Sequence, residues 1–282
     1  MTLEQLIQKK IASLEDIPDE FIDVVNKQND RLFNAVLKLL DKLEKDGDMI
    51  VVSAKNAAIV EQVNELLKKS LFESAYLKGL IKYVSSFSDQ AEMINGIFSE
   101  QFEFVEKEIY KNLLKSSQKA TLEFLDEDAI GKAVFEPLQK NLLTNIYSGG
   151  KYSDMIKSLK DYILGTPELD PKLTSYVKRY ARDSMAIFDN TYTQLIAKDV
   201  QVDIWEYSGG TVKDTREFCL QRHGNVYSKE EIMSWASKDW QGKNPATDEN
   251  TIFAYRGGYN CLHSFIPRDP NFVDNDKRNL YN

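Results

Sequence analysis

Four side chains that commonly bind transition metals lie in the last quarter of this 282-residue sequence. They are the chain's two cysteines and two histidines, Cys219, His223, Cys261 and His263. Cys219 and His223 are four residues apart, a spacing that places both side chains on one face of a helical turn. Cys261 and His263 are two residues apart, which places both on one side of an extended strand. Two thiolates and two imidazoles would complete a closed tetrahedral zinc site.

Three interpretations of these residues stay open on sequence alone. The first is a zinc site, which would stabilise a small, glycine-rich module that has little core of its own. The second is that the cysteines pack as small buried hydrophobic residues while the histidines bind loop backbone. The third is a disulfide, which a reducing cytoplasm disfavours. Zn²⁺ is therefore the one cofactor that the sequence suggests, with all four residues as its ligands.

The rest of the sequence offers little site chemistry for an enzyme. It contains no Walker loop, no Gly-x-Gly-x-x-Gly fingerprint and no His-Glu-x-x-His motif. Either Cys–His pair could act as a nucleophile with its base, but no cysteine-protease signature surrounds them. The sequence therefore favours a protein without enzymatic activity. The alternative is a metal-dependent or thiol hydrolase acting on the cell wall or on nucleic acid.

The bulk composition is that of a folded protein, with 42% hydrophobic and 28% charged residues. The net charge of −8 argues against a general nucleic-acid binder, which normally needs a basic face. No run of eighteen apolar residues occurs, and the N-terminus lacks the apolar core of a secretion signal. We therefore expect synthesis in the cytoplasm and no membrane partner.

Long helices are expected over the first two thirds of the chain. Pro18 is the one proline before Pro137, and glycines are few in this span, which favours uninterrupted helices. Apolar residues recur at spacings of three, four and seven, the period of a helix with one buried face. This period predicts helices over 20–45, 55–86, 88–115, 128–147, 153–164 and 172–199. The β-branched segment 49–53 fits either a brief strand or a connector.

The sequence changes character near residue 199. The segment VQVDIWEYSGG (200–210) alternates apolar and polar residues and ends in a Gly-Gly turn, which predicts a strand. All three tryptophans follow this point. The expected fold is mainly α, a long helical N-terminal region followed by a small α+β C-terminal module. The expected parts are a helical region over 1–150, helices over 151–199 leading into the module, the module over 200–270, and a polar tail over 271–282.

Several short motifs follow one another in the C-terminal module and carry a resemblance to a known family. In order they are Tyr207-Ser208, Thr215-Arg216-Glu217-Phe218-Cys219, His223-Gly224-Asn225-Val226-Tyr227, and Gly257 to Phe265 followed by Pro267. This pattern resembles the C-terminal domain of Mu F-type phage minor head proteins, also called head morphogenesis proteins. The resemblance covers about 150–270. Leu262 departs from it by replacing the usual arginine of the terminal Asn-Cys-Arg element, and Gln221-Arg222 replaces a common acidic step.

The resemblance implies a structural protein of the phage virion. Members of the family lie in the capsid interior near the portal, and they act in capsid assembly or genome ejection. The implied partners are the portal protein and other capsid proteins, with the 1–150 region as the docking part and the host cytoplasm as the place of assembly. A weak contact with packaged DNA stays open. Because the domain also occurs in bacterial toxin chains, a toxin-delivery module is a further alternative.

Overall fold

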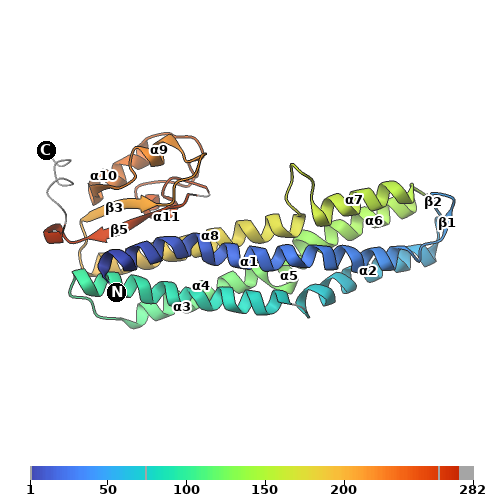
Figure 1. Cartoon of the computed structure of the whole chain (residues 1–282), viewed down its shortest axis with the longest axis horizontal. Coiled ribbons are helices and arrows are strands. Elements are labelled where there is room, and N and C mark those ends of the chain that lie inside the picture. The colour runs from blue at the N-terminus through green and yellow to red at the C-terminus, as the bar shows by residue number, and fades with distance from the viewer. Residues whose placement is uncertain (1, 74, 260, 273–282) are drawn as a thin grey trace. The chain divides into compact units, whose positions relative to one another are not determined.

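The structure, a computed structural model, describes residues 2–73, 75–259 and 261–272. It confirms the predicted fold class, because long helices precede residue 200 and a small module with a few strands follows it (Figure 1). The polar tail predicted at 271–282 lies outside the described residues from 273 onward. None of the described helices is long and apolar enough to cross a membrane.

The helical part begins with α1 (Leu3–Leu40) and a two-stranded antiparallel hairpin of β1 (Lys45–Asp46) and β2 (Met49–Ile50). The helices that follow are α2 (Ala54–Phe72), α3 (Ala75–Gln101), α4 (Glu108–Leu125), α5 (Glu127–Ile130), the π-helical turn Gly131–Phe135, α6 (Glu136–Tyr147), α7 (Tyr152–Leu164) and α8 (Lys172–Asp199). The module contains β3 (Ile204–Gly209), α9 (Glu217–Leu220), β4 (Asn225–Ser228), α10 (Lys229–Ser234), the 3-10 turn Trp235–Ser237, α11 (Ile252–Tyr255), β5 (His263–Arg268) and the 3-10 turn Pro270–Phe272.

Several predicted helix boundaries are wrong. The first helix begins at Leu3 and runs through Pro18, since a proline removes only one backbone N–H and the burial of side chains such as Ile7 holds the early turns in place. The helices predicted over 55–86 and 88–115 are bounded differently in the structure, because α2 ends at Phe72, α3 runs over Ala75–Gln101 and α4 begins at Glu108. In the segment between α3 and α4, Phe104 packs against Phe98 of α3 and Tyr110 of α4, with ring centroids 6.3 and 6.0 Å apart, so aromatic contacts hold this connection in place.

The chain forms two compact units, each built from segments far apart in sequence. The first combines the described residues of Met1–Pro18, Ser85–Lys119 and Arg182–Asn282, and therefore holds the C-terminal module. The second combines Asp19–Val84 and Ala120–Ala181. In the second unit, buried tyrosines tie helix to helix: the Tyr76 hydroxyl donates to the Leu125 carbonyl at 2.7 Å, and the Tyr83 hydroxyl donates to the Ala181 carbonyl at 2.6 Å. These bonds give buried polar atoms the hydrogen-bond partners that they would otherwise lack.

The first unit contains a three-stranded antiparallel sheet in the order β4-β3-β5. Tyr207 of β3 lies opposite Phe265 of β5, and Gly209 lies opposite His263. Directly opposed residues share a face of the sheet, and residues two apart in a strand also share a face. Tyr207, His263 and Phe265 therefore project from the same side.

The two faces of this sheet are covered by different elements. On the Tyr207 face, Phe265 and Tyr207 pack against Trp235, with ring centroids 6.0 and 5.9 Å apart. On the other face, Ile266 forms a buried apolar cluster with Ile7 of α1 and Ile97 of α3. Strand β5 is thus covered on both sides, and its side chains alternate between the loops of the module and the helices of the same unit.

Candidate metal centre

Cys219, Cys261 and His263 form a buried group that could hold a metal ion, and their ligand atoms all lie within 4.8 Å of one another. The two sulfur atoms are 3.8 Å apart, and Cys261 Sγ lies 4.0 Å from His263 Nδ1. Two thiolates on one tetrahedral zinc ion are expected about 3.8 Å apart, because each Zn–S bond is about 2.3 Å long. The distances are therefore compatible with a shared ion. Both cysteines are free, and their sulfurs are too far apart for the disulfide interpretation to describe this structure.

Local backbone structure brings Cys219 to the centre in the way that its spacing predicts. Cys219 lies on α9, and the helical turn continues beyond it because the His223 N–H donates to the Cys219 carbonyl at 2.9 Å. Gly224 then adopts a positive φ of 73°, which ends the turn. The Gly224 N–H donates to the Tyr207 carbonyl at 2.8 Å, so the turn is attached to β3. Cys261 lies two residues before His263, which is the first residue of β5.

His223, the fourth predicted ligand, lies beside the group but not within it. Its ring meets the His263 ring edge-on, with centroids 5.2 Å apart and an interplanar angle of 88°. Partial burial and the neighbouring His263 lower the pKa of His223, which favours the neutral imidazole that metals bind. The structure therefore joins three of the predicted ligands and places the fourth ring next to them.

Tyr207 is a member of this centre that the sequence analysis did not identify as a site residue. Its hydroxyl lies 3.5 Å from Cys219 Sγ and 3.4 Å from Cys261 Sγ, and its ring stacks on His263 with centroids 4.9 Å apart. Burial raises the pKa of Tyr207 well above its ordinary value, so the hydroxyl stays protonated and can donate to sulfur. The alternation of apolar and polar residues in 200–210 indicated that Tyr207 is buried, since Tyr207 shares a strand face with the buried Trp205.

Gly257 leaves the space that the two sulfurs occupy. A Cβ atom at this position would lie 2.4 Å from Cys219 Sγ, 2.8 Å from Cys261 Sγ and 3.0 Å from the Tyr207 hydroxyl. A Gly-Gly pair such as Gly257-Gly258 is typical of a turn. The structure adds a steric reason for the first of the two glycines, because any larger residue would displace the thiols.

The two thiols have different acidities. A hydrogen bond from Cys219, assisted by His263, Arg256 and Tyr207, lowers the pKa of Cys261 well below its ordinary value, against the opposing effect of burial. The bond with Cys261 and burial raise the pKa of Cys219. Cys261 therefore ionises first and accepts a hydrogen bond from the Cys219 thiol, whose proton a bound cation would displace.

A cavity of about 670 Å³ opens beside the group. Cys219, Cys261 and His263 line it together with Arg216 and Glu217. The cavity gives the buried ligand atoms a route by which an ion can reach them.

Comparisons with known proteins identify no relative of this chain. No family model, curated protein or solved structure matches the chain. The chemistry of the centre is therefore inferred from its own geometry.

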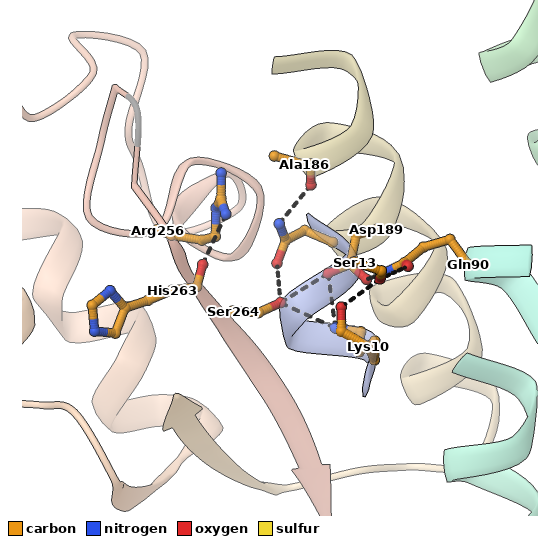
Figure 2. Close-up of polar contacts among 9 residues, drawn as sticks. Lys10, Ser13, Gln90, Ala186, Asp189, Arg256, His263 and Ser264 are labelled. Carbon is orange, nitrogen blue, oxygen red and sulfur yellow. Dashed lines mark hydrogen bonds and ion pairs between the residues drawn. The ribbon is translucent and has the colours of Figure 1, made fainter. Parts of the chain in front are cut away.

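A buried polar network holds β5 on the side opposite the centre (Figure 2). His263 and Ser264 are neighbours on β5, and Figure 2 shows their side chains pointing to opposite sides of the strand. The Ser264 hydroxyl donates to Asp189 Oδ2 at 2.8 Å, and Lys10 Nζ donates to the same oxygen at 2.8 Å. Gln90 donates to Asp189 Oδ1 at 2.7 Å. The strand that carries a candidate ligand is therefore fixed to α1, α3 and α8.

Proposed function

We propose that this chain is a minor head protein of a phage virion, with a structural role in capsid assembly or genome ejection near the portal. The observation that best supports the proposal is the convergence of the motif residues. Tyr207, Cys219, Gly257, Cys261 and His263 carry the family resemblance across 57 positions of sequence, and all of them meet at one centre. A shared centre gives the separated motifs a common physical purpose.

The proposed partners are the portal protein and other capsid proteins, met in the host cytoplasm during assembly. Long helices present extended faces of the kind that dock onto other proteins. The net charge of −8 disfavours collapse onto packaged DNA, so protein contacts would place the chain in the capsid interior.

Purified phage particles provide the test of placement. Quantitative mass spectrometry of virions from the phage that encodes this chain is expected to detect it at far fewer copies than the major capsid protein. A host cytoplasmic protein measured in the same sample controls for carry-over. If the chain is depleted from virions as strongly as that host protein, the structural role in the particle is wrong.

We further propose that the centre binds Zn²⁺ through Cys219, Cys261 and His263, with His223 as the fourth ligand. Thiolate and imidazole ligands together favour zinc over magnesium or calcium, which prefer oxygen. With Zn–N bonds of about 2.0–2.1 Å, two imidazole rings on one tetrahedral ion have centres roughly 5 Å apart. The rings of His223 and His263 have this separation, so a change in side-chain torsion could complete the site. Such an ion would hold α9 and β5 together in a module with a small core.

The zinc proposal is tested by the metal content of the purified full-length chain. Elemental analysis is expected to find about one zinc ion per chain in the wild type and close to none in Cys261→Ala, which removes a ligand. His223→Ala is expected to keep zinc in buffer but to lose it to a chelator sooner than the wild type. Leu262→Ala, a change between two ligands, serves as the matched control and should keep the metal. A wild-type zinc content far below one per chain would dismiss the proposal.

A further inference from the structure

Arg256 is a buried cation with few partners. Its side chain is 7% exposed, and among the described residues its guanidinium makes one hydrogen bond, from Nη1 to the His263 carbonyl at 2.8 Å (Figure 2). Its Nε is buried and has no hydrogen-bond partner among the described residues. A guanidinium carries five N–H donors and stays charged in proteins. Most of the hydrogen-bonding capacity of Arg256 is therefore unused.

No carboxylate in the described ranges forms an ion pair with Arg256. The buried carboxylates of the same unit, Asp189 and Glu206, are already paired with Lys10 and Arg268. A buried charge without a partner is strongly disfavoured, so this guanidinium calls for an anion.

The backbone at Arg256 also indicates a role for its side chain. Arg256 ends α11 with φ 52° and ψ −125°, a left-handed conformation that glycine adopts with little strain and that other residues rarely adopt. An arginine at this position accepts backbone strain that a glycine would avoid. Its side chain is the part that can compensate for that strain.

Arg256 lines a second cavity of about 170 Å³, together with Gly210, Ala12 of α1 and Ala186 of α8. Glu15, Arg182, Asp183 and Cys261 line the same cavity. The two acidic side chains would repel an anion, so a bound anion must lie on the side of Arg256. The volume suits a small group rather than a nucleotide or a peptide.

We propose that this cavity binds a small oxyanion, a phosphate or carboxylate group, through the guanidinium of Arg256. Both groups present paired oxygen atoms that match the fork of N–H donors in arginine. The proposal goes beyond the structural role in the virion and needs neither that role nor the zinc ion. Its test on the purified chain can therefore fail or succeed independently of both.

The direct test is a calorimetric titration of the full-length chain with inorganic phosphate and, separately, with acetate. Sodium chloride at matched ionic strength controls for general screening of charge. Saturable binding of phosphate alone identifies a phosphate site, and saturable binding of acetate alone identifies a carboxylate site. Arg256→Met is expected to weaken that binding at least about tenfold, because it removes the charged hydrogen bonds. The proposal is overturned if neither salt gives saturable binding beyond chloride, or if Arg256→Met binds as tightly as the wild type.

A second pair of variants keeps the test decisive should Arg256→Met fail to fold. Ala12 is exposed, lies on α1 and lines the cavity, so helix-favouring side chains are tolerated there. Ala12→Glu supplies a competing carboxylate and is expected to weaken oxyanion binding about tenfold, whereas the neutral Ala12→Gln of equal size should bind nearly as well as the wild type. Equal affinities of these two variants would reject the assignment.

Discussion

Replacing Asp189 by alanine is expected to lower the free energy of unfolding by about 3–5 kcal/mol. Asp189 is fully buried, and its carboxylate accepts hydrogen bonds from Lys10, Ser264 and Gln90. The variant leaves the Lys10 ammonium, itself 1% exposed, without a counter-charge in the protein interior. Urea denaturation followed by circular dichroism measures the change. Such a loss is a large fraction of the stability of a typical domain.

Two controls separate the lost charge partner from general disruption. The double variant Lys10→Met, Asp189→Leu removes both charges and is expected to be much more stable than Asp189→Ala, because apolar side chains of similar size can replace a buried pair. Glu20→Gln breaks the ion pair with Lys82, whose side chains are 64% and 77% exposed, and should cost less than about 1 kcal/mol. If Asp189→Ala is no more harmful than Glu20→Gln, the buried network does not hold the unit together.

The helical periodicity could be predicted from sequence because it is a local property. Apolar residues at helical spacing on α8, such as Met185, Phe188 and Tyr192, are buried as the pattern requires. The candidate ligands could also be predicted, because the types and spacings of Cys219, Cys261 and His263 limit the chemistry. The sequence could not place His223 relative to the other three, since its position depends on side-chain torsions after the turn.

The buried network could not be predicted, because its members are far apart in the chain. Lys10 and Asp189 are 179 residues apart, and the local sequence around either residue does not indicate that the other is its partner. A weak signal existed in each segment. Lys10 follows the buried Ile7 by three residues, and Asp189 follows the buried Met185 by four, so each charge lies on an apolar helix face. A charge on such a face predicts a buried partner without identifying it.

The roles of Arg256 and Gly257 could not be predicted from the sequence for a related reason. Their surroundings consist of atoms from β3, α9, Cys261 and the start of β5, which come together only in the folded module. From the sequence, Gly257-Gly258 looks like an ordinary turn, and Gly258 does adopt a positive φ of 97°. Gly257 is required because two sulfur atoms occupy the space beside it. The residues next to Gly257 in the sequence do not indicate this requirement.

Strand β5 connects the features that carry the proposals. His263 faces the candidate metal centre, its carbonyl accepts a hydrogen bond from Arg256, and Ser264 enters the Asp189 network on the opposite face. Ligand binding on one side of the strand therefore acts on backbone that the other side holds in place. We expect zinc binding to stabilise the attachment of the module to the helices of the same unit, because binding to the folded form alone raises its stability.

The Gly257→Ala variant is expected to lose the metal centre while keeping the helical fold. Its new methyl group would lie 2.4 and 2.8 Å from the sulfurs of Cys219 and Cys261, so the thiols must separate. Overpacking of this kind typically costs about 1–3 kcal/mol, and the displaced sulfurs can no longer share one ion. Elemental analysis should find close to no zinc in the variant, while far-ultraviolet circular dichroism should show the helix content of the wild type.

Gly150→Ala is the matched control for this prediction. Gly150 has no positive φ, and the nearest heavy atoms to an added Cβ lie at 3.4 Å, so the methyl group is tolerated there. The control should retain about one zinc ion per chain, which assigns the loss in Gly257→Ala to its position beside the sulfurs. Equal zinc content and equal resistance to a chelator in the two variants would mean that the thiols do not form the metal centre proposed here. Loss of zinc from Gly257→Ala alone would show that a glycine is needed because two sulfur ligands occupy the space of its missing side chain.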